Sequence, residues 1–218
     1  MRNWIILWVQ AEQRPNYFFH YNGKALCGQE RAGLSGQRKV NFLSGFLSEA
    51  EGTVLLWIQE HIRCVGLDAV TVGFTSLGDG GMLWIALSLV MLCFKRTRKA
   101  GVTGLLALAL GAAITNLTLK PLVHRVRPWL VVEGLNALVQ PGDPHSFPSG
   151  HTCAAFAATC GWWCYLPKKW GITALVCAAL MGLSRLYIGV HFPTDVLVGA
   201  LVGVLCGWTA GQIGRNKR

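Results

Sequence analysis

Long apolar blocks dominate this sequence and restrict the folds that are open to it. Hydrophobic residues occupy 52% of the 218 positions, and charged residues occupy only 14%. Soluble domains usually carry roughly a quarter charged residues. Because lipid offers the backbone no hydrogen-bond partners, a membrane chain must satisfy its own backbone groups in helices or closed barrels. The blocks are too long for strands and rich in Ala, Leu and Gly, so we expect an all-α, integral-membrane helical bundle.

Five apolar blocks predict about five transmembrane helices. The blocks are Met82–Phe94, Val102–Leu119, Thr152–Leu166, Ile172–Ile188 and Val196–Ile213. A helix needs roughly 20 residues to cross the hydrocarbon core, so the first and third blocks are expected to extend into flanking residues. The length suits one domain, which we place at residues 53–218.

The segment ahead of these blocks is only partly apolar. Within residues 1–52, the run Trp4–Val9 is too short for a membrane span or a signal peptide. We therefore expect residues 1–52 to form a poorly ordered or peripheral extension. Alternatively, they result from an artefactual or alternative translation start upstream of the true domain. The segment Thr53–Leu67 differs, because one helical face carries Val54, Ile58, Ile62 and Val65. This pattern predicts an N-terminal amphipathic helix that lies in the membrane interface.

Basic clusters predict how the bundle is oriented. They are Lys95–Lys99, Lys168–Lys169 and Arg215–Arg218. Alternating crossings put all three on one side, which the positive-inside rule assigns to the cytoplasm. The loops Lys120–Gly150 and Gly189–Asp195 then share the extracytoplasmic face of a multi-pass protein of the cell membrane. Most of the net charge of +10 is explained by contacts with the lipid bilayer. The cations of the first outer loop, Arg125 among them, break the charge bias and need another explanation. No nucleic-acid-binding pattern and no obligate protein partner are evident.

Polar clusters lie on the predicted outer face, each at the end of an apolar block. Lys120 and Arg127 are seven residues apart, so on a continuous helix they share one face, although Pro121 can kink that register. The sequence Pro148-Ser149-Gly150-His151 opens a helix, where free backbone N–H groups can bind an anion. Alone, the cations are typical of side chains that snorkel to headgroups, and the Pro-Ser-Gly turn is ordinary punctuation.

The third cluster contains Arg185, His191 and Asp195. Asp195 follows a proline near the start of the last helix, so it can reach back to the ring of His191. Taken alone, the two residues are explained equally well as a structural hydrogen-bonded pair. The ordinary explanations do not account for all three clusters at once. Three separate segments would have to place cations, histidines and an anion-binding turn on one membrane face by chance.

Together the clusters indicate phosphoryl transfer. Its transition state spreads negative charge over three oxygens, so catalysis depends mainly on positioning and positive charge. Lys120, Arg127 and Arg185 supply that charge, and the two arginines can bind phosphate bidentately.

The histidines supply the proton chemistry. His191 is a competent nucleophile when its ring is neutral, and Asp195 can hold the proton on the other nitrogen. His151 can protonate the leaving oxygen and then activate water. These three residues could in principle bind zinc, but the three cations of the site repel a divalent ion and replace its charge. We therefore expect a metal-independent enzyme without a cofactor.

The motifs resemble the three-part signature of the phosphatidic acid phosphatase type 2 superfamily. They are Lys120-x6-Arg127-Pro128, Pro148-Ser149-Gly150-His151 and Ser184-Arg185-x5-His191-x3-Asp195. The similarity runs roughly from Thr53 to Ile213. It implies a helical bundle, a phosphohistidine intermediate and an active site at the outer membrane face. It implies phosphate binding by Lys120, Arg127, Ser149, Gly150 and Arg185. It also implies acid–base catalysis by His151, nucleophilic attack by His191 and support of that ring by Asp195.

The resemblance leaves the substrate open. Bacterial members of similar size are phosphatases for phosphatidic acid, phosphatidylglycerophosphate or undecaprenyl pyrophosphate, so the expected partner is a membrane lipid phosphate. Soluble acid phosphatases and vanadium haloperoxidases share the site, but the apolar blocks argue against both. The Trp129–Phe147 loop could guide a lipid tail or simply anchor in the interface. An alternative function is a lipid phosphotransferase that uses the same histidine with a second acceptor. A channel, transporter or phosphate-binding protein explains the helices and cations but not the histidines and Asp195.

Overall fold

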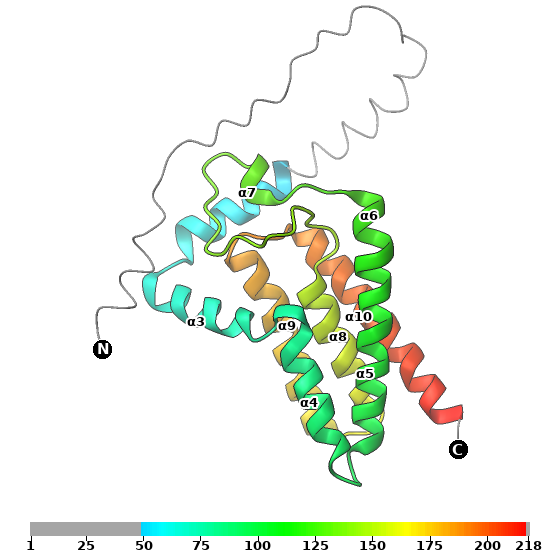
Figure 1. Ribbon diagram of the computed structural model, residues 1–218. Helices are drawn as coiled ribbons and strands as arrows, with labels where there is room; N and C mark the ends of the chain where they lie inside the picture. The colour runs from blue at the N-terminus through cyan, green and yellow to red at the C-terminus, as the bar shows by residue number, and fades with distance from the viewer. Residues whose placement is uncertain (1–48, 217–218) are drawn as a thin grey trace, which may run out of the picture. The chain divides into compact units, whose positions relative to one another are not determined.

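The computed structural model describes residues 49–216, and the chain in this range is helical (Figure 1). Most of the predicted extension, residues 1–48, therefore lies outside the described residues. A first helix covers residues 49–61 and is followed by α3 (Val65–Ser76). The described residues contain no strand, only an isolated bridge between Val126 and His145. The predicted all-α fold is confirmed.

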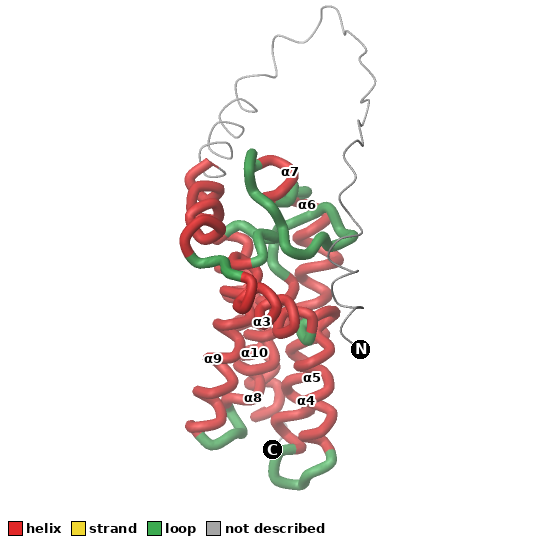
Figure 2. Tube along the Cα trace, turned by 90° about the vertical axis from the view of Figure 1, so that its left-hand side faces the viewer, coloured by secondary structure: helices red, strands yellow, loops and turns green. Residues whose placement is uncertain are grey.

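Five helices form the bundle: α4 (Met82–Leu92), α5 (Arg98–Ala112), α8 (Gly150–Trp163), α9 (Lys168–Tyr187) and α10 (Pro193–Asn216). They correspond in order to the five predicted apolar blocks. Helix α8 packs against α5, α9 and α10 and lies among them in both views (Figures 1 and 2). Trp162 on α8 donates a buried hydrogen bond to Ser88 on α4 at 3.2 Å, so the inner helix is also connected to α4.

Not all five helices are long enough to cross a membrane unaided. Among the described residues, three segments pass on length and hydropathy: Arg98–Val123, Lys168–Tyr187 and Pro193–Arg215. A fourth is formed if Val65–Ser76 and Asp79–Leu92, which meet at a bend of 45°, act as one broken span. Helix α8 has only 14 residues, so the third predicted block is a short inner helix enclosed by longer ones.

The first described helix differs from the predicted one. It begins at residue 49 and ends at 61, and the chain is non-helical at 63–64 before α3 starts. The predicted single helix over Thr53–Leu67 is therefore broken, and α3 runs across the bundle rather than along it (Figure 1). Leu55 faces the protein and is fully buried, whereas Val54 and Ile62 remain more than 40% exposed. Ile58 of the predicted apolar face packs against the buried cluster of Tyr187, Ile188 and Val190, so this face is only partly turned away from the protein.

Glycines set how closely α10 approaches α8. Gly203 and Gly207 are one turn apart, and a Cβ at either position would lie 2.6 Å from the Cys153 carbonyl oxygen or 2.5 Å from the Cys160 Cβ. Small residues at four-residue spacing allow membrane helices to pack backbone against backbone. This packing aligns the N-terminal ends of α8 and α10, which both carry predicted site residues.

Helix α5 does not continue as a regular helix to Arg127. It passes into a π-helical turn, η2 (Ala113–Leu119), and then α6 (Lys120–Val123), where His124 ends the helix in a left-handed conformation (φ 49°). Pro121 lacks an N–H, and in a regular α-helix its ring would meet the carbonyl of Leu117. The predicted helical register between Lys120 and Arg127 is therefore wrong, because Arg127 lies in extended backbone (φ −70°, ψ 149°) before α7 (Pro128–Val131).

Candidate functional site

The course of the chain brings the three predicted clusters to one end of the bundle. Helices α5 and α9 end there, and α8 and α10 begin there (Figure 1). The Lys95–Lys99 turn and the C-terminal end of α10 lie at the opposite end. Loops gather at these two ends (Figure 2). This arrangement agrees with the predicted separation of the basic clusters from the site.

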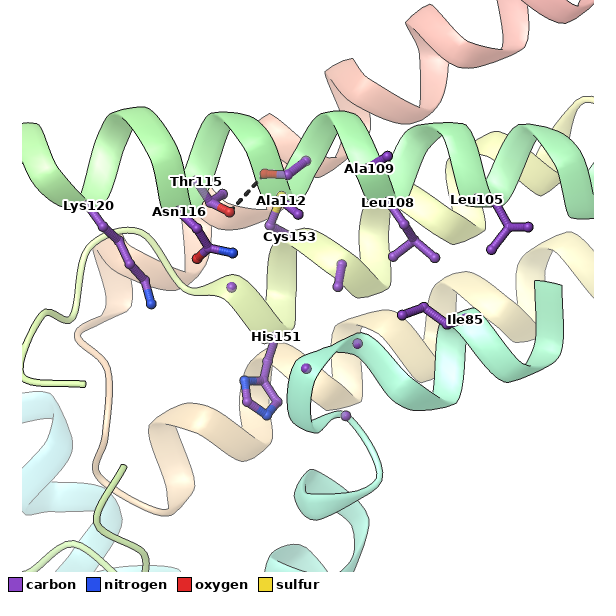
Figure 3. Close-up of a pocket in the computed structure, with 16 residues that line it drawn as sticks. Ile85, Leu105, Leu108, Ala109, Ala112, Thr115, Asn116, Lys120, His151 and Cys153 are labelled. Carbon is purple, nitrogen blue, oxygen red and sulfur yellow. Dashed lines mark hydrogen bonds between the residues drawn. The ribbon is translucent and has the colours of Figure 1, made fainter. Parts of the chain in front are cut away.

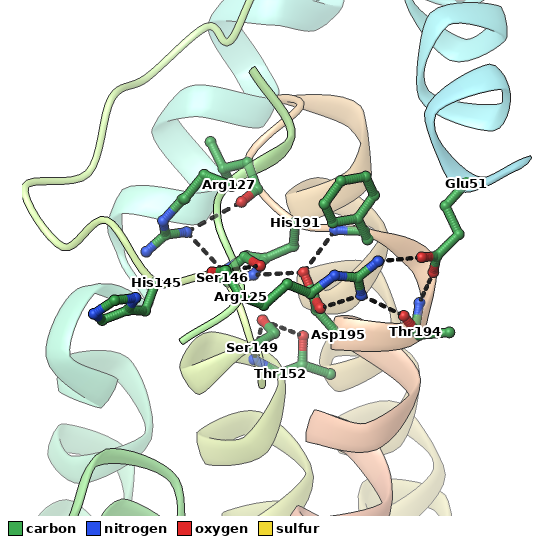
Figure 4. A network of polar contacts seen from close by, with 12 residues as sticks. Glu51, Arg125, Arg127, His145, Ser146, Ser149, Thr152, His191, Thr194 and Asp195 are labelled. Atoms are coloured by element: carbon green, nitrogen blue, oxygen red, sulfur yellow. Dashed lines mark hydrogen bonds and ion pairs between the residues drawn. The ribbon is translucent and has the colours of Figure 1, made fainter. Parts of the chain in front are cut away.

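His191 lies in the turn between α9 and α10 and is 2% exposed. Its Nε2 is 3.2 Å from Nη1 of Arg127 (Figure 4). A guanidinium can only donate hydrogen bonds, so Nε2 must accept and the ring proton is assigned to Nδ1. The contact therefore places the unprotonated nitrogen of the imidazole beside a buried positive charge.

Asp195 faces the other side of this ring. Its Oδ2 is 3.7 Å from His191 Nδ1, which is too long for a hydrogen bond but close enough for a strong electrostatic interaction. Oδ2 accepts a hydrogen bond from the N–H of Phe192 at 2.8 Å, and Oδ1 accepts one from Arg125 at 2.8 Å. The fully buried carboxylate is thus fixed by partners other than the histidine.

Burial also determines the protonation of His191. The buried site disfavours a charged ring and is the main cause that lowers the pKa of His191 to about 3. The positive charges of Arg185 and Arg127 act in the same direction, and Asp195 opposes them. The ring is consequently neutral at physiological pH, the state that a nucleophile needs.

Lys120 and Arg127 meet through an acidic residue of the following loop. The Asp143 carboxylate pairs with Lys120 Nζ and lies 3.9 Å from Arg127 Nη2. The backbone carbonyl of Asp143 accepts a hydrogen bond from Arg127 Nε at 2.8 Å. Burial alone raises the pKa of Asp143, but hydrogen bonds from Lys120 and the His145 N–H outweigh it and lower that pKa. An ionised carboxylate therefore lies between the two predicted phosphate-binding cations.

Arg185, on the last turn of α9, is 3% exposed. Its Nη1 donates to Thr75 Oγ1 on α3 at 2.7 Å. Its buried Nε has no hydrogen-bond partner among the described residues. A buried donor without a partner is costly, so this N–H is available to an anion.

The start of α8 has the predicted anion-binding geometry, although Ser149 has a different use. The buried Ser149 hydroxyl caps the helix, accepting hydrogen bonds from the Thr152 backbone at 3.5 Å and the Thr152 hydroxyl at 2.9 Å. Its own N–H donates to the Asp195 carbonyl at 3.0 Å. A Cβ on Gly150 would meet nothing within 4 Å. Open space therefore lies beside the backbone of Gly150, where an anion can approach.

His151 is paired with a carboxylate that sequence reasoning did not single out. Its Nε2 is 2.9 Å from Oδ1 of Asp79. Asp79 belongs to the short turn η1 (Asp79–Gly81) ahead of α4, and the sequence offers only its position among glycines. The described site thus contains two histidines that each face an aspartate.

A cavity of about 470 Å³ opens next to His151 (Figure 3). Its polar end carries His151, Lys120 and Asn116, and its apolar end carries Leu105 and Ile85, with α5 and α4 on either side. His191 does not line it. The cavity is therefore amphipathic, and it leads from the cations toward the apolar middle of the bundle.

One further residue missed by sequence reasoning, Glu51, helps to hold Asp195 through Arg125. Glu51 is buried, pairs with Arg125 and accepts from the N–H of Thr194 at 2.7 Å (Figure 4). Glu51 lies on the far side of the boundary we placed at residue 53, in the helix that begins at 49. The only available signal was Arg125, a cation on the outer side that headgroup contacts did not explain.

Comparisons with known proteins show which families and structures the chain is similar to. The PAP2 superfamily profile matches residues 100–218, more than half of the chain. An undecaprenyl-diphosphatase from Sulfolobus acidocaldarius is 30% identical over 131 residues, covering 60% of this chain and 63% of that protein. Phosphatidylglycerophosphatase B from Bacillus subtilis is 34% identical over 155 residues, covering 66% of this chain and 73% of that protein. The chain thus spans less than two thirds of the Sulfolobus protein.

A solved structure is also similar. The transmembrane PAP2-type phosphatidylglycerolphosphate phosphatase from Bacillus subtilis matches with a TM-score of 0.64 at 28% identity, covering 82% of this chain and 89% of that one. The multi-pass helical architecture is therefore shared with a membrane phosphatase.

Proposed function

This chain belongs to the PAP2 superfamily, and on that basis we propose that it is a membrane phosphatase that hydrolyses a lipid phosphate monoester or pyrophosphate. The observation that carries the proposal is the 3.2 Å contact between Arg127 Nη1 and His191 Nε2. It sets a phosphate-binding group against the lone pair of a neutral histidine. Anion binding and nucleophilic attack then occur at one point.

The reaction proceeds in two displacements on phosphorus. In the first, His191 Nε2 attacks the phosphorus and the bond between phosphorus and the leaving oxygen breaks. His151 gives that oxygen a proton. The Nη1 of Arg127 transfers its hydrogen bond from Nε2 to a phosphate oxygen. In the second, water attacks the phosphorus of the phosphohistidine and gives a proton to His151. The bond between phosphorus and Nε2 breaks, so His191 is regenerated and phosphate leaves.

Positive charge stabilises both displacements. Lys120, Arg127 and the unpartnered Nε of Arg185 bind the equatorial oxygens, with the open backbone at Gly150 as a further anion contact. Asp195 keeps the proton on His191 Nδ1 and balances the charge that develops on the ring. Because these cations supply the charge that a metal ion provides elsewhere, the reaction needs no metal.

A lipid substrate is supported by the cavity beside His151. Its polar end suits a phosphate group and its apolar end suits a hydrocarbon chain. Phosphatidic acid, phosphatidylglycerophosphate and undecaprenyl pyrophosphate all have this amphipathic form, and two of the relatives are named for the last two. The basic turns at the opposite end of the bundle favour an active site on the extracytoplasmic face.

The test is phosphate release by detergent-purified protein from these three lipids, each with excess EDTA. We expect release without any added acceptor, undiminished by EDTA, and lowered at least about 1000-fold in His191→Ala. Loss of activity with chelator, restored by a divalent metal, would contradict metal independence. Release that requires a second lipid acceptor would identify a phosphotransferase instead.

The intermediate and the membrane face are tested separately. Rapid acid-free quenching with a ³²P-labelled lipid should trap label on wild-type protein and none on His191→Ala. In intact spheroplasts, a water-soluble phosphate ester added outside should be hydrolysed before lysis. Hydrolysis only after lysis would place the site on the cytoplasmic side.

A further inference from the structure

A second carboxylate, outside the three sequence motifs, contacts the acid–base histidine. We infer that Asp79 is a positioning residue that holds the Nε2 proton of His151, so that Nδ1 alone exchanges protons with the leaving oxygen and with water. The inference rests on the proposed function and assigns a role to a turn that the motifs do not include. It is carried by the 2.9 Å contact between Asp79 Oδ1 and His151 Nε2.

The local fold is built for this contact. Asp79 is the first residue of η1, and Gly80 and Gly81 follow it in left-handed conformations, with φ of 58° and 76°. Residues with side chains rarely adopt this backbone. On the other side, a Cβ at Gly78 would lie 3.0 Å from His151 Cδ2. Glycines therefore let the turn wrap closely around the imidazole and direct the aspartate at its Nε2.

The contact determines which nitrogen does the chemistry. A carboxylate only accepts hydrogen bonds, so Nε2 carries a proton in both forms of the ring. In the protonated ring, Nδ1–H is the donor to the leaving oxygen. In the neutral ring, the Nδ1 lone pair takes the proton from the attacking water. Asp79 keeps its hydrogen bond throughout, and the proton that His151 gives to the leaving oxygen is replaced by one from the attacking water.

The charges around His151 make such a partner necessary. Burial disfavours a positive ring, and the charges of Arg185 from α9 and Arg127 from the segment before α7 act in the same direction. Lys120 lines the same cavity. Asp79 is the acidic side chain in contact with the ring among the described residues. It stabilises the imidazolium that has to form on leaving-group protonation.

Asp79→Asn keeps the size of the side chain and removes its charge. We expect kcat/KM for a lipid phosphate to fall roughly 10-fold or more, a smaller loss than the roughly 100- to 10,000-fold that removing the acid–base residue itself causes. The alkaline limb of the pH profile should move to lower pH by about one unit or more, because the imidazolium loses its counter-charge. Asp79→Glu should restore part of the rate and return the limb toward its original position. Glu60→Gln, an exposed carboxylate on the first helix, is the matched control and should leave both unchanged.

Two measurements separate this role from a structural one. With p-nitrophenyl phosphate, whose leaving group departs without protonation, the loss in kcat/KM for Asp79→Asn should be smaller than with a lipid. Adding Asp79→Asn to His151→Gln should cause little further loss, since the two residues act as one unit. Equal losses with both substrates, an unmoved alkaline limb or additive losses would each overturn the inference. If His191→Ala keeps its activity, the proposed function fails instead, irrespective of Asp79.

Discussion

Arg125 donates a 2.8 Å hydrogen bond to Oδ1 of Asp195, so the carboxylate that faces the nucleophile is held by a cation from another segment. The same guanidinium pairs with Glu51 and lies 4.0 Å over the ring of Phe192. A single side chain thus links the first described helix, the segment after His124 and the start of α10. Positioning of His191 extends well beyond the motif that contains it.

Arg125→Ala should therefore destabilise the protein. It leaves two carboxylates facing each other without a cation, Glu51 at 8% and Asp195 at 0% side-chain exposure. Removing one partner of a buried ion pair costs about 3–5 kcal/mol, and the 19% exposure of Arg125 favours the lower end. Thermal unfolding in detergent should show a clearly lowered midpoint. Lys169→Ala, at the opposite end of the bundle, should change it little, and equal midpoints for the two variants would contradict the argument.

The pH profile should be asymmetric. Catalysis needs a neutral His191, whose pKa is lowered to about 3. Activity is therefore retained as the pH falls through 6.5, the usual value for histidine, and is lost only as it approaches the lowered pKa. The alkaline limb belongs to His151, which must be protonated. Burial, and after it the charge of Arg185, lowers the pKa of His151 to about 4, so this limb also lies below 6.5 and activity falls as the pH rises from acid toward neutrality. Measuring kcat/KM from pH 4 to 9 tests this, and an acid limb centred near 6.5 would show that His191 is not in the buried state described here.

This result refines what the residue pattern alone predicted. The sequence alone would place both limbs in the ordinary histidine range, because spacing contains no information on burial. The identities of His191 and Asp195 followed from a motif of fixed spacing at a helix start. The depth of the ring, and the two arginines that oppose its charge, depend on how α9, α10 and the segment before α7 pack together.

Residue spacing does not show which distant segments pack together, and this explains which site residues were missed. Glu51, Asp79 and Asp143 contact the site from segments 70 or more residues away in the chain or from an irregular loop, so no local period marks them. The apolar blocks predicted the bundle because burial in lipid demands a composition that sequence displays directly. They did not predict the π-helical turn before Pro121, which arises from one missing N–H and its ring.

Asp143 should compete with phosphate for the site. Its carboxylate pairs with Lys120 and lies 3.9 Å from Arg127, in the position expected of an anionic ligand. Asp143→Asn should therefore tighten inhibition by inorganic phosphate or vanadate, by roughly two- to fivefold, because the carboxylate is 38% exposed and such pairs contribute about 1 kcal/mol or less. Glu133→Gln, an exposed neighbour in the same loop region, is the control. Weaker inhibition would mean that Asp143 instead holds the two cations in their binding positions.

The cavity beside His151 should distinguish lipids from small phosphate esters. Ala109 lines its wall on α5, and Ala109→Phe would fill the space that we assign to the hydrocarbon chain. Hydrophobic pocket contacts contribute about 1–3 kcal/mol per methylene-sized change, so kcat/KM for a long-chain lipid should fall at least about tenfold. Activity on p-nitrophenyl phosphate should persist, because the phosphate-binding end is untouched. Val102→Phe, at a 55% exposed position of the same helix, controls for added bulk. If Ala109→Phe lowers both activities equally, the cavity does not bind the lipid chain.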